Sequence, residues 1–280
     1  MQHSMRPVRP DSPPVARLER LANRIRREMP GFETPNDCRN ENSIRIRILR
    51  KVGNLPGKQV CLKLADKLES CQPEQRCGSM ACMACQRTRR LNFVYKWLPL
   101  LRADPGYSMV TLIFYEEMLA DRQLLGWKLA ALKERLRKQL GRIGFNKPIF
   151  GGFEMDYHLY THQPEASHWM PHFHLLVPGE PEKLRRLRDY MLREKNQSVR
   201  KRRKNRPMRE DKVVHPLEVL TYCVAGMWQE KVWFLYQDET LKSQKKLRRI
   251  RSDKVFAKSL VVLDRMGESM LNFSVNVQKK

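Results

Sequence analysis

The chain has 280 residues, of which 41% are hydrophobic, a composition typical of a folded protein with a sizeable apolar core. Its 55 Lys and Arg outnumber 30 Asp and Glu and give a formal net charge of +25, which favours nucleic acid as the partner. Because the sequence lacks both an apolar stretch of about 18 residues and an N-terminal secretion signal, we expect no membrane partner and a cytoplasmic location.

The N-terminal part of the chain is basic. Apolar residues recur at helical spacing between Val15 and Met29, which predicts an amphipathic helix with a basic face. From Ser43 to Val52, apolar and basic residues alternate as they do in a half-exposed strand. We therefore interpret residues 1–58 as a basic arm that contains one helix and one strand.

A cysteine-rich segment follows, which we interpret as a small zinc-binding module over residues 59–98. The chain has seven cysteines, an odd number that suits reduced thiols better than a disulfide framework. The predicted ligands of a structural Zn²⁺ are Cys71, Cys77, Cys82 and Cys85. A shell of four thiolates leaves no open position, so this ion would stabilise a loop without doing chemistry. Cys38 and Cys61 are reserve ligands, and a group of buried, metal-free thiols is the alternative.

The middle of the chain alternates strand and helix patterns. Apolar residues at helical spacing predict helices over 86–101, 121–141, 180–195 and 215–229. Runs rich in β-branched and aromatic residues predict strands over 106–114, 148–160, 168–177 and 231–236. This order predicts an α+β fold with a mainly antiparallel sheet, in a domain over 105–240 that is followed by a basic extension over 241–280.

Two basic segments are candidates for phosphate contacts. The first is the helix after the cysteines, with Arg87, Arg89 and Arg90. The second is the run "RKRRKNR" at 200–206, which is also predicted to be a solvated linker; the two interpretations are compatible. Its candidate residues are Arg200, Lys201, Arg202, Arg203 and Lys204.

A pair of histidines stands out in the predicted strand "HWMPHFHLLV". Alternate side chains of a strand point to the same face, so His172 and His174 lie about 7 Å apart along one face. If the strand that carries Glu154 pairs with this one, two imidazole nitrogens and a carboxylate oxygen suit Mg²⁺ or Mn²⁺ with open positions for water and phosphate. Two buried, hydrogen-bonded histidines would give the same pattern. His158, His162 and His168 are alternative ligands.

Several of these segments resemble motifs of the HUH endonucleases, in the order found in rolling-circle replication initiators of plasmids and phages. "YSMVTLIF" resembles the hydrophobic-Thr motif, "WMPHFHLLV" the His-hydrophobe-His motif and "LEVLTYCVAG" the tyrosine motif. The stretch "CGSMACMACQRTRR" resembles the cysteine-rich part of many plasmid initiators. The resemblance covers about residues 71–236.

The resemblance implies an HUH fold, which is RRM-like, and a metal-dependent DNA nickase. In this family both histidines hold a divalent ion, and a tyrosine attacks a DNA phosphate to give a 5′-phosphotyrosine link and a free 3′-hydroxyl. The implied partners are single-stranded DNA, double-stranded origin DNA, and a host helicase and polymerase. Glu154 matches the acidic position that often supplies the third ligand.

The nucleophile that we predict is Tyr222, which lies among apolar residues of a predicted helix. The family usually has a lysine three residues after the tyrosine, whereas this chain has Ala225 there, so Lys231 or another cation takes that role or the tyrosine is a different one. Tyr190 is the second candidate because Arg193 follows it at that spacing. A third candidate is Tyr236.

Three classes of function remain open at the level of sequence. The leading hypothesis is a site-specific nickase and strand transferase that starts rolling-circle replication, and an HUH transposase would use the same chemistry. The chain is otherwise a zinc-stabilised nucleic-acid-binding protein without nicking activity. A metal-dependent hydrolase, for which the tyrosines are irrelevant, is the third class.

Overall fold

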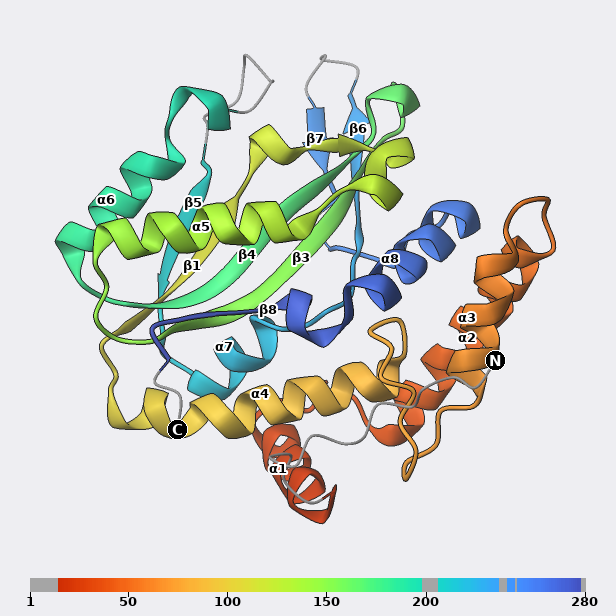
Figure 1. Ribbon diagram of the computed structural model, residues 1–280, viewed down its shortest axis with the longest axis horizontal. Helices are drawn as coiled ribbons and strands as arrows, with labels where there is room; N and C mark the ends of the chain where they lie inside the picture. The colour runs from red at the N-terminus through yellow and green to blue at the C-terminus, as the bar shows by residue number, and fades with distance from the viewer. Residues whose placement is uncertain (1–14, 198–205, 237–240, 245, 278–280) are drawn as a thin grey trace.

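A computed structural model describes residues 15–197, 206–236, 241–244 and 246–277, and it has the α+β architecture expected from the sequence (Figure 1). The strands of the described residues form one eight-stranded curled sheet, with the order β5-β1-β4-β3-β6-β7, while β2 pairs with β4 and β8 with β3. The strands are β1 Tyr107–Ile113, β2 Leu119–Ala120, β3 Ile149–Tyr160, β4 His168–Pro178, β5 Met208–Lys212, β6 Glu230–Leu235, β7 Leu241–Ser243 and β8 Asn272–Val275. Only the β3–β6 pair is parallel among them, so the mainly antiparallel sheet is confirmed.

Helices cover both faces of this sheet. The α-helices are α1 Val15–Glu28, α2 Pro35–Gly53, α3 Gln59–Glu69, α4 Met83–Ala103, α5 Leu129–Ile143, α6 Pro181–Met191, α7 Pro216–Tyr222 and α8 Asp253–Leu271. Short 3₁₀ helices are η1 Tyr115–Glu117, η2 Asp121–Gly126, η3 Pro164–Ala166 and η4 Glu194–Asn196. Helices α5 and α6 pack on one face, where α5 crosses β3 and β4 in Figure 1, and α4 and α7 pack on the other.

Strand β4 is buried on both faces, and its alternation decides which side chains meet which helices. Phe173 and its same-face neighbours join the apolar cluster that includes α5 and α6. Leu176 joins the cluster of α4 and α7, in which Trp97 stacks on Phe150 with ring centroids 4.0 Å apart. His172 and His174 share the face of Leu176, so they lie on the side of the sheet that α4 and α7 cover.

The strand predicted from Ser43 to Val52 is wrong, because this segment lies inside α2. Thr34 caps the helix: its hydroxyl accepts from the N–H of Asp37, and the Asp37 carboxylate accepts from the N–H of Thr34, which completes a capping box. Arg45 is buried and donates to the carboxylate of Glu41, one helical turn earlier. The alternation is therefore misleading, since one of its basic residues faces the interior in an ion pair.

Two other predicted helices have different bounds. The helix predicted over 121–141 starts as a 3₁₀ turn, and its α-helical part ends at Ile143, where Gly144 adopts a left-handed conformation with φ 84°. The helix predicted over 215–229 ends at Tyr222, and Gly226, with φ 71°, turns the chain toward β6. The left-handed conformation favours glycine at both turns.

The C-terminal segment is more structured than the sequence pattern indicated. Ser252 caps α8, and this helix buries a row of apolar residues against the sheet and α2. One cluster of buried apolar residues contains Val52, Leu64, Phe153 and Phe256, so it draws on all four predicted segments of the chain. The division into those segments stays a prediction. No helix in the described ranges has the length and apolar character that a membrane crossing requires.

Gly152 lets α7 approach the sheet closely. A Cβ atom at this position would lie 2.3 Å from the backbone oxygen of Cys223. We expect Gly152→Ala to lower the free energy of unfolding by about 2 kcal/mol or more, because two backbone segments have to separate. Gly141→Ala is the control: its Cβ meets no atom within 4 Å on α5, and it is expected to stabilise the protein by ~0.5 kcal/mol or more. Chemical denaturation measures both, and equal stability of the two variants would contradict the expectation.

Candidate metal centres and nucleophile

The pairing of β3 with β4 brings the three predicted ligands of the divalent ion together. Glu154 lies directly opposite His172, and Gly152 lies opposite His174. One ligand atom from each of Glu154, His172 and His174 lies within 4.8 Å of the other two. The closest approach recorded between a histidine and the carboxylate is 3.9 Å, from Nε2 of His174 to Oε2 of Glu154. These distances allow one small cation to contact all three side chains.

Each of the three ligand side chains is oriented by a hydrogen bond to an atom that is not a metal ligand. Nδ1 of His172 lies 3.1 Å from the carbonyl oxygen of Met170, so Nδ1 carries the proton and Nε2 keeps its lone pair for a metal. Nδ1 of His174 lies 3.0 Å from the hydroxyl of Thr111 on β1. The N–H of Gly226 donates to Oε1 of Glu154 at 2.8 Å, which leaves the other carboxylate oxygen available.

Burial shifts the pKa values of His174 and Glu154 toward their neutral forms. Burial, and then the neighbouring His172, hold the pKa of His174 well below its usual range, so this imidazole is neutral at pH 7. Burial raises the pKa of Glu154, while His172, the N–H of Gly226 and Arg89 act in the opposite direction. A neutral imidazole and a carboxylate are the forms that bind metals, and a cation beside them would favour both.

A pocket opens in front of the three ligands, and it has a volume of about 270 Å³. Tyr222, Asp156 and Arg90 contribute to its walls together with the ligands. This set of two nitrogens and one oxygen suits Mg²⁺ or Mn²⁺. Water or phosphate oxygens would fill the remaining coordination positions from the open side. The donor set and the open side therefore fit a catalytic ion better than a closed structural one.

Tyr222 is the last residue of α7 and contacts this site. Its ring lies edge-on to that of His174, with centroids 4.6 Å apart, and 51% of the side chain is exposed. Partial burial, and then the charges of Glu154 and Asp156, raise the pKa of Tyr222 to about 12. The phenol is therefore protonated at neutral pH and becomes a better nucleophile when a cation balances those carboxylates.

The other two candidate tyrosines lie elsewhere in the described structure. Tyr190 is on α6, which packs on the opposite face of the sheet, and the guanidinium of Arg193 sits 4.0 Å from its ring centroid. Tyr236 follows β6, with the amine of Lys242 4.5 Å from its ring centroid. Neither contributes to the pocket wall. Of the three candidate tyrosines, Tyr222 is therefore the one that lies beside the predicted metal ligands.

The three arginines predicted to contact phosphates have different surroundings. Arg87 is buried, with two hydrogen bonds to the carboxylate of Glu19 and one to the carbonyl oxygen of Glu33. Arg89 is also buried and donates to Asn272 and Leu271. These internal contacts leave neither side chain on the surface. Arg90 alone of the three lines the pocket, where it is paired with the carboxylate of Glu33 at 2.6 Å.

The remaining basic candidates, Arg200, Lys201, Arg202, Arg203 and Lys204, lie outside the described residues. The alternative histidine ligands lie further along the strands: the rings of His158 and His168 have centroids 5.2 Å apart, and His162 lies beside Tyr160. Lys231, proposed as a replacement for the missing lysine, is opposite His158 in the pairing of β3 with β6. Its charge lowers the pKa of Asp156, although burial has the larger, opposite effect on that group.

Asp156 is a residue of the pocket that sequence reasoning missed. It follows Glu154 by two positions on β3, so the two carboxylates share a face. The acidic pair at strand spacing in "FEMDY" is the signal that would have indicated it. Burial raises the pKa of Asp156; in its ionised form this carboxylate would add to the electrostatic attraction for a cation.

The four predicted zinc ligands also come together. One sulfur from each of Cys71, Cys77, Cys82 and Cys85 lies within 4.8 Å of the others. The recorded sulfur–sulfur distances are 3.8 Å from Cys71 to Cys85, 3.6 Å from Cys77 to Cys85 and 3.6 Å from Cys82 to Cys71. Four sulfurs at about 2.3 Å from a tetrahedral Zn²⁺ would be ~3.8 Å apart, so the cluster has nearly the size that zinc requires.

The two reserve cysteines are not part of this cluster. Cys38 is buried in α2, where burial raises the pKa of its thiol to about 12, and Cys61 is buried in α3. The cluster instead receives polar contacts from Asn42, whose amide nitrogen donates to the sulfur of Cys82 at 3.2 Å and whose oxygen accepts from the N–H of Met83 at 2.8 Å. Such contacts orient metal-binding thiolates from outside the first shell.

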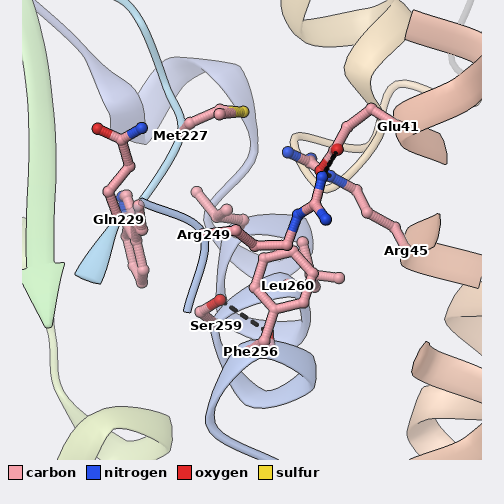
Figure 2. A pocket seen from close by; sticks show the side chains of 10 residues that line it. Glu41, Arg45, Met227, Gln229, Arg249, Phe256, Ser259 and Leu260 are labelled. Atoms are coloured by element: carbon pink, nitrogen blue, oxygen red, sulfur yellow. Dashed lines mark hydrogen bonds and ion pairs between the residues drawn. The ribbon is translucent and has the colours of Figure 1, made fainter. Parts of the chain in front are cut away.

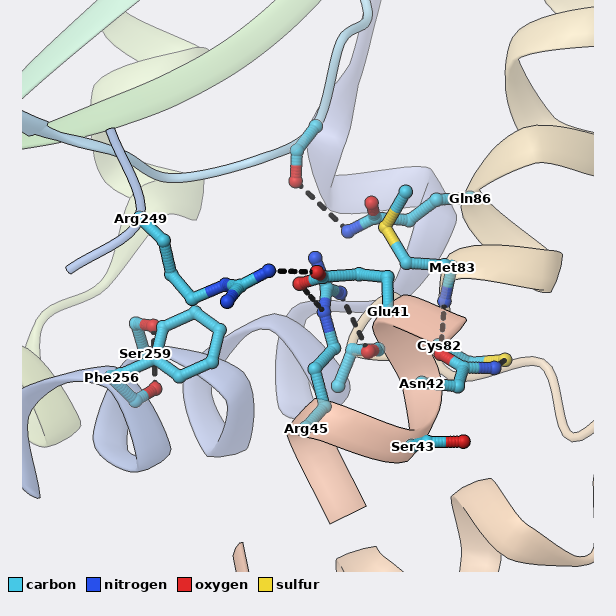
Figure 3. A network of polar contacts seen from close by, with 12 residues as sticks. Glu41, Asn42, Ser43, Arg45, Cys82, Met83, Gln86, Arg249, Phe256 and Ser259 are labelled. Carbon is cyan, nitrogen blue, oxygen red and sulfur yellow. Dashed lines mark hydrogen bonds and ion pairs between the residues drawn. The ribbon is translucent and has the colours of Figure 1, made fainter. Parts of the chain in front are cut away.

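An ion-pair network next to the cluster connects it to the C-terminal part of the chain. Glu41 accepts hydrogen bonds from both Arg45 and Arg249, and Arg45 also donates to the backbone oxygen of Ala81 at 2.8 Å (Figure 3). Figure 2 shows the small cavity beside it, about 10 Å³, whose lining includes Glu41, Arg249 and Phe256. Among the described residues, the groups of metal-binding side chains lie elsewhere. This network packs α2 and the cysteine-rich loop together without forming a second reactive site.

A comparison of this chain with protein-family models, with curated proteins and with solved structures gives no match. The geometry therefore carries the functional argument.

The cysteine cluster predicts one tightly bound zinc per chain. We expect Cys85→Ser to lose most of this zinc, because three sulfurs cannot close the tetrahedral shell. Cys61→Ser, which changes a buried thiol outside the cluster, is expected to retain a full equivalent. Elemental analysis of the purified proteins measures the difference. Equal zinc content in the two variants would exclude the four-cysteine site.

The histidine pair predicts a second, weaker site. We expect His172→Ala with His174→Ala to abolish Mn²⁺ binding measured by electron paramagnetic resonance, since two of three ligands are lost. His168→Ala, on the same strand but outside the ligand set, is expected to bind Mn²⁺ as the wild type does. Undiminished binding by the double variant would rule out this assignment.

Proposed function

We propose that the protein is a metal-dependent DNA nickase and strand transferase of the HUH type, in which Tyr222 forms a 5′-phosphotyrosine intermediate. The observation that carries this proposal is the position of Tyr222. Its ring contacts His174 at the mouth of a pocket whose floor holds Glu154, His172 and His174. A nucleophile next to an open set of metal ligands is the arrangement that phosphoryl transfer needs.

The proposed reaction uses these positions in the following way. The Tyr222 oxygen forms a bond to phosphorus, and the bond from phosphorus to the 3′ oxygen of the preceding nucleotide breaks. The phenol proton passes to water, and the departing 3′ oxygen gains a proton to become a free hydroxyl. A bound Mg²⁺ or Mn²⁺ would polarise the phosphate and balance the developing negative charge. Because the phosphotyrosine link conserves the bond, the strand can later be rejoined.

The protein's own residues prepare this step. Thr111 and the carbonyl oxygen of Met170 hold the two imidazole rings, and Gly226 holds Glu154. Arg90 lies at the pocket wall, where its guanidinium is placed for a phosphate oxygen if Glu33 releases it. The net charge of +25 supports a polyanionic substrate, and a single strand best allows one phosphate to enter such a pocket.

Rolling-circle replication is the process that we propose for this chemistry, on the strength of the motif order in the sequence. Single-stranded and double-stranded origin DNA would then be the substrates, with a host helicase and polymerase as partners. A transposase would use the same site and the same covalent intermediate. The two are distinguished by their DNA sites and partners rather than by the residues of the pocket.

One observation favours a second candidate function, that of a nucleic-acid-binding protein without nicking activity. Ala225 occupies the pocket wall at the position where the resembled family usually has a lysine. The pKa of Tyr222 is raised to about 12, so activation of the phenol depends on whatever cation is present. Arg209, whose charge lowers the pKa of Tyr222, is one described basic side chain that could substitute for that lysine. Arg90 in the pocket wall and Lys231, whose charge acts on Asp156, are two others.

The test is the formation of a covalent adduct between the protein and single-stranded DNA. With Mn²⁺ present, we expect Tyr222→Phe to lower adduct formation by about 100-fold or more while DNA binding is unchanged, because only the attacking oxygen is removed. Tyr190→Phe, the matched control, is expected to form adduct at the wild-type rate. Adduct formation is measured by denaturing gel electrophoresis, and mass spectrometry identifies the modified tyrosine.

Three results would overturn the assignment in different ways. Adduct with Tyr222→Phe but not with Tyr190→Phe would move the nucleophile to α6. Cleavage to free ends without adduct would indicate a hydrolase. Binding without cleavage would support the second candidate. This test needs a panel of single strands that covers the DNA molecule on which the protein is encoded.

A further inference from the structure

A chain of hydrogen bonds leads from the first turn of α4 toward the Glu154 site. Cys82 precedes this helix as its N-cap residue, and Cys85 lies in its first turn. The next residue, Gln86, is 1% exposed, and its amide contacts backbone oxygens. It therefore belongs to the same rigid turn as two of the four zinc ligands, and any movement of that turn moves Gln86 as well.

The amide of Gln86 bridges two backbone segments. Its nitrogen donates to the carbonyl oxygen of Met80, in the loop between Cys77 and Cys82, and to the carbonyl oxygen of Gly226 at 2.9 Å. Both partners can only accept, so the amide nitrogen has to face them. Gln86 thus joins the cysteine-rich loop to the turn that follows α7.

Gly226 connects Gln86 to the divalent-metal site. While its carbonyl oxygen accepts from Gln86, its N–H donates to Oε1 of Glu154 at 2.8 Å. Its backbone is left-handed, with φ 71°, and a Cβ atom there would lie 3.0 Å from Nη1 of Arg89. The turn is therefore confined from two sides, by the amide of Gln86 and by the guanidinium of Arg89 one helical turn further along α4.

We propose that Gln86 is a positioning residue that couples the four-cysteine cluster to the divalent-metal site. Metal in the cluster fixes the loop that carries Met80 and the first turn of α4. Gln86 then holds Gly226, and Gly226 holds the Glu154 carboxylate in the orientation that binds the second cation. The inference rests on the metal site in the proposed function, but it does not depend on nicking or on the identity of the nucleophile.

The physical basis is the irregular backbone of the loop. Between Ser70 and Cys82 the chain lies outside the helices and strands; Arg45 holds the backbone oxygen of Ala81, and the four sulfurs connect the earlier part of the loop to the first turn of α4. If the sulfurs separate, the carbonyl oxygen of Met80 and the amide of Gln86 lose their fixed geometry. Residues that orient a metal ligand from outside the first shell typically change metal affinity by about 10-fold to 100-fold.

The first test is the isosteric change Gln86→Glu, which replaces the donating amide by a carboxylate facing two carbonyl oxygens. We expect the Mn²⁺ dissociation constant, measured by electron paramagnetic resonance, to rise by about tenfold or more while zinc stays at one per chain. Mn²⁺ reports on the Glu154 site because four thiolates select zinc. Gln139→Glu, on α5 at the opposite face of the sheet, controls for the added charge and is expected to change the constant by less than about twofold.

The second test uses the wild-type protein, so it does not depend on the folding of a variant. Zinc is removed with a chelator, the chelator is removed, and hydrogen exchange is followed in the peptide that contains Gly226. We expect its amide to exchange at least about tenfold faster without zinc, while β3 and β4 keep their protection. The Mn²⁺ dissociation constant of the zinc-free protein should rise together with this exchange rate.

The outcomes separate the two proposals. If Gln86→Glu and zinc removal both leave Mn²⁺ affinity and Gly226 exchange within about twofold of the wild type, the coupling is wrong and the metal site stands. If Mn²⁺ fails to bind even the zinc-loaded wild type, the metal site of the proposed function is wrong.

A double-mutant cycle gives a third test of the coupling. Cys77→Ser should weaken Mn²⁺ binding far less in the Gln86→Glu background than it does alone. Full additivity of the two effects would also exclude the coupling.

Discussion

The registration of β3 against β4 is the constraint on which the rest of the site depends. It places Glu154 opposite His172 and Gly152 opposite His174, and β1 on the other side of β4 supplies Thr111 opposite His174. A slip of one residue would send Glu154 to the face that α5 and α6 cover, away from both imidazoles. The apolar residues that alternate with the ligands fix this register, since they fill the core under α5 and α6.

The position of α7 depends on the close approach of its backbone to β3. Because Gly152 has no side chain, the end of α7 lies against the sheet and Tyr222 reaches the ring of His174. Gly226 then turns the chain so that its N–H meets Glu154. The metal ligands come from strands and the tyrosine from a helix terminus, so rigid elements hold the whole group.

The sequence was sufficient where the spacing of one residue type indicated which side chains come together. Strand spacing placed His172 and His174 on one face, and cysteine spacing identified the four sulfurs that meet. The contact of Glu154 with the histidines had to be assumed, because strand register depends on tertiary packing. Between Ser43 and Val52, alternation was mistaken for a strand because the burial of Arg45 in an ion pair is invisible in the sequence. The HUH fold and the nicking activity remain predictions that the described architecture accommodates.

Buried arginines have a consequence for how the protein would respond to ionic strength. Arg45 and Arg87 pair with the carboxylates of Glu41 and Glu19, while Arg89 donates to the amide oxygen of Asn272 and the backbone oxygen of Leu271. All three side chains are buried, so they do not face a ligand at the surface. Only cations that face a nucleic-acid strand displace condensed counterions when it binds. The dependence of nucleic-acid binding on salt concentration should therefore exclude these three arginines, although they are counted among the 55 Lys and Arg of the chain.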